Sequence, residues 1–312
     1  MKKLRTNFNL VLTLILFSSL ACTLNSPKSI VVSQSQPTSA TIPFNSQENG
    51  VLEIAIIPSV TSSEQRNKIQ LLEEYLKQEL NQPVKIQLTK DYETAIDLLV
   101  NGKVEVAYLG PLAYIQAKQR NPNLEPIVAH IEKTTGRPWY TSVIVVNSQA
   151  GINTIQDIKG KRFGFVSLSS TSGFLVPSAK FKKLGIKPDQ DFSEVQYSSG
   201  HDKNIMALAN NKVDAIAVEK QTYIEALQQN KLPENKYKVI WESDPIPNSP
   251  FVISSSLPLE LKTKLQRALI NAPEGLVSVG GTTATGYTVV QDEDYEPIRQ
   301  LQTFLKQPSQ NQ

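Results

Sequence analysis

Three consecutive hydroxyl side chains, Ser170, Thr171 and Ser172, stand where an apolar stretch gives way to a helical one. The apolar stretch, residues 162–166, predicts a strand, and residues 174–183 predict a helix. The first N–H groups of a helix have no partner within it, and the helix dipole is positive at that end. Hydroxyl and N–H donors gathered there suit an oxyanion without any lysine or arginine. The run therefore predicts an oxyanion site.

The same run has a simpler interpretation. Ser and Thr are common N-cap residues, so a hydroxyl here can serve only to start the helix. A cap needs one hydroxyl and the chain offers three, so both interpretations remain open on these residues alone. Ser59 lies in another predicted strand-to-helix turn, and we include it as a second candidate contact.

The pattern of the elements indicates how these residues are positioned. From Val51 onward, apolar strand-like runs alternate with amphipathic stretches, and Ser62 and Gln65 have the spacing of a capping box at the start of one of them. Repeated strand–helix–strand units predict an α/β protein whose mainly parallel sheets carry helices on both faces. Ligands of such sheets bind at the carboxyl ends of strands, next to helix N-termini.

The order of the elements predicts two α/β lobes joined by two crossings, near residues 141–147 and 244–254. A ligand between two such lobes would couple binding to hinge closure. The expected segments are a first lobe, a second lobe and a short polar tail, at residues 51–144 with 251–306, 145–250, and 307–312.

The N-terminus has the pattern of an export signal, with a basic start, an apolar run and then Cys22. Cys22 is the only cysteine and has no internal disulfide partner, which favours lipidation, although Ser19 departs from the usual lipobox. A soluble exported form is the alternative. Residues 23–50 are polar and predict a flexible tether. We therefore expect a lipoprotein-type signal peptide over residues 1–22 and a periplasmic or cell-surface protein with a lipid anchor.

The formal net charge of +3 is supplied by Lys2, Lys3 and Arg5, so the rest of the chain is close to neutral. No basic patch indicates nucleic acid as a partner. An anionic ligand must therefore be held mainly by neutral donors. Because the chain has one cysteine and two histidines, we expect neither a metal centre nor a cofactor.

The stretch Ser170-Thr-Ser-Gly-Phe-Leu-Val-Pro177 is accompanied by further motifs. They are Asp91-Tyr92, Tyr108-Leu-Gly-Pro-Leu-Ala-Tyr114, Pro138-Trp-Tyr-Thr-Ser-Val143, Ile158-Lys-Gly-Lys-Arg162, Gly200-His-Asp-Lys-Asn204, Val213-Asp214, Trp241-Glu-Ser243 and Ile246-Pro247. Together they resemble the substrate-binding proteins of bacterial phosphonate, phosphite and phosphate ABC transporters. The resemblance extends from Val51 to about Phe304. It implies a two-lobed, type II-like periplasmic binding protein that holds a phosphorus oxyanion in its cleft.

By that resemblance, hydroxyls, backbone N–H groups, an imidazole and two phenols donate hydrogen bonds to the ligand. The implied residues are Ser170, Thr171, Ser172 and His201, with Tyr92 and Tyr140 from the opposite lobe. All of them can donate, and hydrogen bonds to a charged acceptor are about twice as strong as neutral ones. Without the resemblance, His201 has the simpler interpretation of a capping or exposed residue. We interpret His130 as structural, and Tyr108 and Tyr114 as core or rim residues.

The resemblance also bears on the choice of ligand. Relatives that bind aminoalkylphosphonates carry an Asp where this chain has Ser249, and a second acid near Gln221. Burying an ammonium group without a counter-charge is unfavourable, so we expect phosphite, phosphate or a small alkylphosphonate such as methylphosphonate. Glu219 and Asp244 are nearby acids that weaken this exclusion, unless one of them accepts a proton from the oxyanion.

The implied function is that of the substrate-binding component of an ABC importer, a monomer that delivers its ligand to a membrane permease. A two-lobed protein that binds a sulfonate or serves a sensor kinase is the alternative. Ser170 or Ser172 with His201 would also suit a hydrolase. The chain has no Gly-x-Ser-x-Gly elbow, no His-Glu-x-x-His and no phosphate loop, so we expect no enzyme.

Overall fold

The computed structural model describes residues 50–277 and 279–307 of the 312-residue chain. The expected signal peptide, the lipidated Cys22, residues 23–49 of the tether and the tail beyond 307 lie outside this part. Within it, no helix combines the length and the apolar character needed to cross a membrane.

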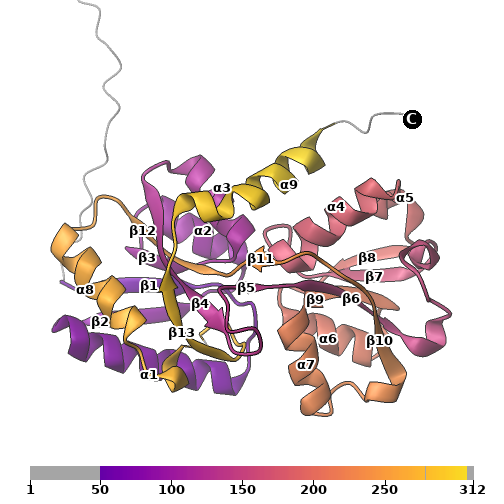
Figure 1. The fold of residues 1–312 in the computed structure, drawn as a ribbon, viewed down its shortest axis with the longest axis horizontal. Helices are drawn as coiled ribbons and strands as arrows, with labels where there is room; N and C mark the ends of the chain where they lie inside the picture. The colour runs from indigo at the N-terminus through magenta and orange to yellow at the C-terminus, as the bar shows by residue number, and fades with distance from the viewer. Residues whose placement is uncertain (1–49, 278, 308–312) are drawn as a thin grey trace, which may run out of the picture. The chain divides into compact units, whose positions relative to one another are not determined.

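Six strands form the first sheet, in the order β13-β4-β12-β3-β1-β2. Helices α1 and α8 cover one of its faces, and α2 and α3 cover the other (Figure 1). Helix α9 packs on α3. We call this sheet and its helices the first lobe. Its elements are β1 (Leu52–Ile56), α1 (Ser63–Leu80), β2 (Val84–Leu88), α2 (Tyr92–Val100), β3 (Val106–Tyr108), α3 (Pro111–Arg120), β4 (Leu124–Glu132), β12 (Pro250–Ser254), α8 (Leu259–Ile270), β13 (Ala284–Val289) and α9 (Glu296–Lys306).

Five strands form the second sheet, in the order β10-β6-β9-β7-β8. Helices α4 and α5 lie on one side of it, and α6 and α7 lie on the other (Figure 1). We call this sheet and its helices the second lobe. Its elements are β6 (Ser142–Asn147), β7 (Arg162–Phe165), α4 (Val176–Lys183), α5 (Pro188–Asp191), β8 (Glu194–Tyr197), α6 (His201–Ala209), β9 (Ala215–Glu219), α7 (Lys220–Gln228) and β10 (Tyr237–Glu242). A π-helical turn, η3 (Thr171–Leu175), precedes α4.

The two-lobed α/β prediction is confirmed, but the sheets are mixed rather than mainly parallel. In the first sheet β1 runs parallel to β2 and β3, whereas β12 is antiparallel to β3 and β4, and β13 to β4. In the second sheet β7 is parallel to β8 and β9, whereas β6 is antiparallel to β9 and β10. Strands that follow a crossing between lobes enter their sheet from the opposite end, which reverses their direction.

The packing of the second lobe follows from side-chain alternation along its central strands. Successive side chains of a strand point to opposite faces of the sheet. Along β6, Ile144 and Val146 therefore pack beneath α4 together with Phe163, while Val143 and Val145 pack against α6 and α7. In the first lobe, the predicted start of α1 is confirmed, because the Ser62 hydroxyl accepts a hydrogen bond from the Gln65 N–H at 3.1 Å.

A two-stranded ribbon lies where the chain passes between the lobes. It pairs β5 (Trp139–Tyr140) with β11 (Ile246–Pro247) in antiparallel register. The expectation of a first crossing near residues 141–147 was wrong by a few residues, because the alternating apolar side chains of β6 already belong to the second sheet. Both connections are short and paired, so they suit a hinge.

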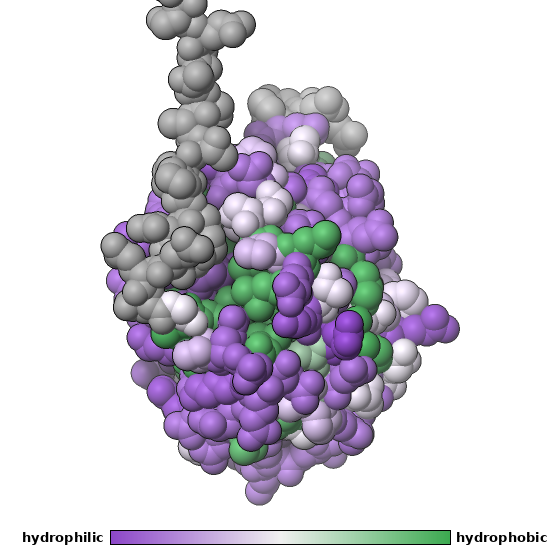
Figure 2. All heavy atoms as spheres, turned by 90° about the vertical axis from the view of Figure 1, so that its left-hand side faces the viewer, coloured by the Kyte–Doolittle hydropathy of each residue, from purple (hydrophilic) through white to green (hydrophobic). Residues whose placement is uncertain are grey.

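The outer surface of the first lobe carries several exposed apolar side chains. Figure 2, which views the molecule from the side of α8, shows a strip of apolar side chains within a largely hydrophilic surface. Exposed apolar residues of this lobe include Leu71 on α1, with Leu259 and Ile270 on α8.

Candidate functional site

A small cavity lies between the two lobes, at the carboxyl ends of β1, β3, β7 and β9. The space open to the centre of a water-sized sphere is about 20 Å³. The seven residues predicted as ligand contacts all line it, namely Ser59, Tyr92, Tyr140, Ser170, Thr171, Ser172 and His201. The structure thus brings together side chains from distant parts of the chain, at the place in an α/β fold where ligands bind.

The hydroxyl run begins the π-helical turn η3, and its side chains are held by the protein in different ways. The Ser170 hydroxyl caps the turn by accepting from the Gly173 N–H at 3.1 Å, and its carbonyl accepts from the Leu175 N–H. The Thr171 hydroxyl accepts from the Leu112 N–H of the first lobe at 2.8 Å. Each of these two hydroxyl oxygens therefore accepts one backbone hydrogen bond, and each hydroxyl also lies beside a phenol, Ser170 beside Tyr92 and Thr171 beside Tyr140. The capping interpretation is therefore confirmed for Ser170, and its contact with a ligand stays a prediction.

Close packing fixes the path of this turn. A Cβ atom added at Gly173 would lie 2.4 Å from a methyl carbon of Val166, so only glycine fits there. π-Helical turns are rare and occur mostly at functional sites. The turn places all three hydroxyl-bearing residues against the cavity, each at most 2% exposed.

His201 is held as a neutral donor. Its Nδ1 accepts a hydrogen bond from the Glu219 backbone N–H at 3.2 Å, so the ring proton resides on Nε2. Burial lowers the pKa of His201 to about 4, with the nearby Asp202 acting in the opposite direction. The imidazole therefore offers one N–H without a positive charge at neutral pH.

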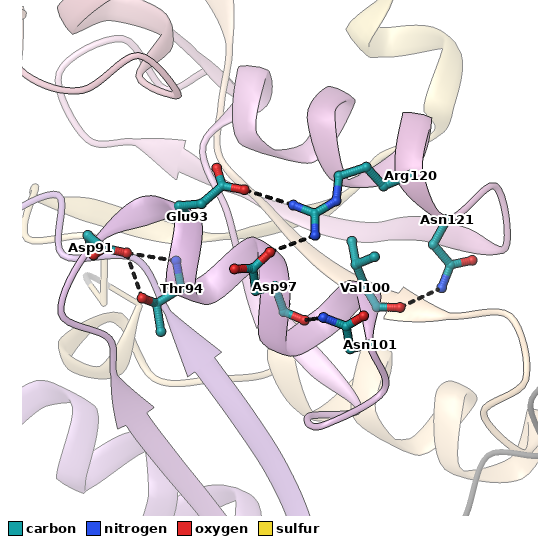
Figure 3. Close-up of polar contacts among 8 residues, drawn as sticks. All are labelled: Asp91, Glu93, Thr94, Asp97, Val100, Asn101, Arg120 and Asn121. Carbon is teal, nitrogen blue, oxygen red and sulfur yellow. Dashed lines mark hydrogen bonds and ion pairs between the residues drawn. The ribbon is translucent and has the colours of Figure 1, made fainter.

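Tyr92 reaches the cavity from the first residue of α2. The Asp91 carboxylate caps this helix by accepting from the Thr94 N–H at 2.7 Å (Figure 3). The Arg120 guanidinium of α3 binds the carboxylates of Glu93 and Asp97, which ties the two helices together (Figure 3). Burial raises the pKa of the Tyr92 phenol, so it stays protonated and able to donate.

Tyr140 comes from the hinge ribbon, where it pairs with Ile246. Burial raises the pKa of its phenol, and Glu219 adds to the rise, whereas hydrogen bonds from Ser172 and Thr171 oppose it. The phenol oxygen thus lies beside the hydroxyl run. A tyrosine of the hinge and the mouth of η3 therefore belong to one network.

Ser59 lines the cavity, but its hydroxyl is already used. It donates to the Gly280 carbonyl at 2.7 Å, and the Ser59 carbonyl accepts from the His201 N–H at 2.7 Å. Direct donation to a ligand would break the first of these bonds. The geometry therefore favours a role in joining the lobes over the direct contact that we expected.

The sequence analysis missed several residues that line the cavity. They are Thr282, which was not considered, and His130 and Tyr108, which were interpreted as structural and as core or rim. Glu219 and Ser249, which were discussed in relation to the choice of ligand, also line the cavity, whereas Asp244 does not. Burial raises the pKa of Glu219 well above its ordinary value, and the carboxylates of Glu132 and Glu225 add to this. Among the described residues around the cavity, none is a lysine or an arginine. The lining is rich in neutral donors and holds one carboxyl group.

Hydrogen bonds across the mouth of the cavity hold the lobes together. The Asp202 carboxylate accepts from the backbone N–H and the hydroxyl of Thr61, both at 3.0 Å. Glu225 accepts in the same way from Thr283, at 3.1 and 2.9 Å. With the Leu112 to Thr171 bond, these contacts join the two lobes around the cavity.

The fold and the enclosed polar cavity define a two-lobed binding protein of the kind that closes around a small solute. Residues 54–295 match the family described as ABC transporter, phosphonate, periplasmic substrate-binding protein. The chain belongs to this family, whose members are substrate-binding proteins of transporters.

Individual relatives agree with this membership. The phosphate-import protein PhnD of Mycolicibacterium smegmatis is 27% identical over 80% of this chain and 84% of its own length. The phosphonates-binding periplasmic protein of Escherichia coli is 32% identical over 69% of this chain and 64% of its own length. A binding protein component of an ABC phosphonate transporter from Pseudomonas aeruginosa superimposes with a TM-score of 0.75 at 26% identity, covering 83% of this chain and 87% of that protein.

Proposed function

We propose that this protein binds a small phosphorus oxyanion, namely phosphite, phosphate or methylphosphonate, in the cavity between its lobes and delivers it to an ABC permease. The observation that carries the proposal is the enclosed cavity lined by hydroxyl, phenol and imidazole groups that can all donate hydrogen bonds. Such donors bind an anion best when they are fixed in place beforehand, as the bonds to Ser170, Thr171 and His201 ensure.

The size of the cavity supports a small ligand. A space of about 20 Å³ for the centres of water-sized spheres corresponds to a roughly spherical hole about 3 Å in radius. This is close to the reach of one central atom surrounded by four tetrahedral substituents. A ligand with an aminoethyl arm exceeds it in the closed arrangement.

The charges of the residues that line the cavity also bear on the choice of ligand. Ser249, which by the resemblance replaces the carboxylate of aminoalkylphosphonate-binding relatives, lines the cavity, whereas Gln221 does not. Glu219 is the one carboxyl group in the cavity, and its raised pKa favours a neutral, protonated carboxyl group. A protonated Glu219 can donate to an oxyanion instead of pairing with an ammonium group.

Hinge closure links binding to delivery. The bonds from Thr61 to Asp202 and from Thr283 to Glu225 form only when the lobes meet. A ligand that bridges η3 and Tyr92 favours the closed form by its contacts with both lobes. A permease can then recognise the closed protein.

A hydrolytic role has less support. In the parts of the chain that the structure describes, no serine or threonine hydroxyl is hydrogen-bonded to His201, whose Nδ1 is taken by the Glu219 N–H. Nucleophilic catalysis needs a base within hydrogen-bond reach of the nucleophile. We therefore assign the hydroxyl run to binding rather than to catalysis.

The lipid anchor is part of the same proposal. Acylation of Cys22 would hold the lobes at a membrane through the polar segment that follows, close to a permease. Expression of the full chain and of Cys22→Ala, followed by membrane fractionation, tests this. The wild-type protein should sediment with membranes and the variant should be released, and equal sedimentation of both would argue against the anchor.

The test of the ligand is a calorimetric titration of the purified protein with phosphite, methylphosphonate, phosphate, 2-aminoethylphosphonate and sulfate. We expect saturable 1:1 binding of at least one of the first three, and weaker binding of the last two. Binding of 2-aminoethylphosphonate more tightly than the three small ligands would overturn the ligand assignment. No binding of any of them would leave the family fold without the proposed function.

A further inference from the structure

His130 is a buried residue for which the predicted site has no role. It lies on β4 of the first lobe, is 4% exposed and lines the cavity. Its Nε2 is buried and has no hydrogen-bond partner anywhere in residues 50–277 and 279–307. Its backbone carbonyl accepts from the Asn248 side chain at 3.1 Å, which fixes the strand at this point. An unpartnered polar atom of a fixed side chain at the wall of a cavity points to a ligand.

The neighbours of His130 determine which nitrogen carries the proton. The Tyr108 hydroxyl lies 3.0 Å from Nδ1. Burial raises the pKa of the Tyr108 phenol, so it keeps its proton at neutral pH, and the Ser249 side chain is within hydrogen-bond reach of the same oxygen. We infer that the phenol donates this proton to Nδ1. The ring proton of neutral His130 then resides on Nε2.

The same arrangement occurs at His201 in the other lobe. There the Glu219 N–H donates to Nδ1 and leaves the proton on Nε2. Burial lowers the pKa of both imidazoles to about 4. Two neutral imidazoles, one from each lobe, thus line one cavity, each with a donor at Nδ1.

We propose that His130 is a further ligand-binding residue, which donates from Nε2 to an oxygen of the bound oxyanion, and that Tyr108 is the positioning residue that fixes its tautomer. The proposal rests on the proposed function, since it names a second imidazole donor for the same ligand. Among the described residues this N–H has no partner, which is unfavourable for a buried donor. An oxyanion supplies the missing acceptor and joins the first lobe to the second.

The first experiment measures affinity in four variants. Loss of a hydrogen bond to a charged acceptor should weaken the binding of the best oxyanion by about 10- to 150-fold in His130→Ala. His130→Gln keeps an N–H group and should recover part of that loss. Tyr108→Phe removes only the hydroxyl that fixes the tautomer of His130, and it should weaken ligand binding by several-fold. Tyr75→Phe is the control, because that phenol donates to the Ala268 carbonyl away from the cavity and should leave affinity unchanged.

A second measurement needs no variant. Nitrogen-15 NMR of the imidazoles in the wild-type protein reports the tautomer directly. We expect both histidines to be protonated at Nε2 near neutral pH, and the Nε2 signal of His130 to shift when the oxyanion is added. A His130 protonated at Nδ1, or an Nε2 chemical shift that does not change when the ligand is added, would overturn the inference. This test remains valid even if the variants fail to fold.

The outcomes separate this inference from the function on which it rests. If the wild-type protein binds none of the phosphorus oxyanions, the proposed function fails. If the wild-type protein binds one of them, and His201→Ala weakens binding while His130→Ala does not, the function stands and the His130 assignment is wrong.

Discussion

Replacement of Ser172 by alanine separates binding from folding at the mouth of η3. The Ser172 side chain is 1% exposed and lines the cavity, where it lies beside the Tyr140 phenol. Its carbonyl, which accepts from the Ser142 hydroxyl at 2.7 Å, is retained in the variant. The variant loses the contact of this hydroxyl with the Tyr140 phenol and, in the complex, one hydrogen bond to an anion, which is worth about 1.5–3 kcal/mol. We expect the dissociation constant of the best oxyanion to rise by about 10- to 150-fold.

Ser170→Ala provides the contrast, because the Ser170 hydroxyl also caps η3. Loss of an N-cap typically destabilises a protein by about 1 kcal/mol, which corresponds to a fall in Tm of about 2–4 °C for a protein of this size. Ser170→Ala should therefore lower both the affinity and the Tm of the ligand-free protein. Ser172→Ala should lower the affinity and leave that Tm nearly unchanged.

The assay combines calorimetric titration with thermal unfolding in the absence of ligand. Ser178→Ala on α4 is the control for affinity, since this hydroxyl lies outside the cavity. The hydroxyl is buried without a hydrogen-bond partner among the described residues, so the variant should not lower the Tm. Wild-type affinity in Ser172→Ala would refute the reasoning. The hydroxyl run would then be an ordinary cap, and the oxyanion would have to bind elsewhere.

Three further changes test closure, pH dependence and packing. Asp202→Ala removes two hydrogen bonds between the lobes, both to Thr61. The affinity for the ligand should fall about tenfold, and small-angle scattering should show a more open ligand-free protein. An unchanged affinity would exclude a role of Asp202 in closure. Burial lowers the pKa of His201 to about 4 from the ordinary imidazole value of about 6.5. As pH falls, the unfolded chain therefore takes up a proton first, and up to about 3 kcal/mol of stability is lost between pH 6.5 and 4. Because burial lowers the pKa of His130 to about 4 as well, His201→Gln should remove only the His201 share of the loss, and an equally steep profile would contradict the assignment. Gly164→Ala places a Cβ 2.4 Å from Oδ1 of Asn204, whose side-chain amide donates to two backbone carbonyls. The free energy of unfolding, measured by denaturant titration, should fall by about 1–3 kcal/mol. Wild-type stability would show that the surrounding residues relax to accept the methyl group.

Local patterns in the sequence predicted the parts of the site that are themselves local. A strand, a turn of hydroxyls and a helix are adjacent in the chain, so the position of Ser170 to Ser172 follows from sequence order. The capping of α1 by Ser62 was predictable for the same reason. The family resemblance, and no local pattern, predicted that these residues lie close to Tyr92 and Tyr140. All of them line one cavity, in agreement with that prediction.

Contacts made by long-range strand pairing could not be predicted in this way. His130 lies on β4, which pairs with β12 and β13 far along the chain, and no local motif marks that strand. Tyr108 is the last residue of β3, and its sequence context alone is typical of a core residue. Its place beside β12 and the Gly280 backbone follows only from the three-dimensional structure. Glu219 ends β9, and its burial depends on both lobes. For such residues the sequence shows the type of side chain but not its surroundings.

The lack of lysine and arginine among the described residues of the cavity has a consequence for the solutions in which the protein can work. Dissolved salt screens exposed charges over a distance of about 10 Å at 0.1 M and less at higher concentrations, but it acts weakly on groups sealed from solvent. A site lined by cations attracts every small anion, chloride included. A site built from fixed neutral dipoles retains its affinity as ionic strength changes, and it distinguishes anions by the arrangement of their oxygens rather than by their charge alone.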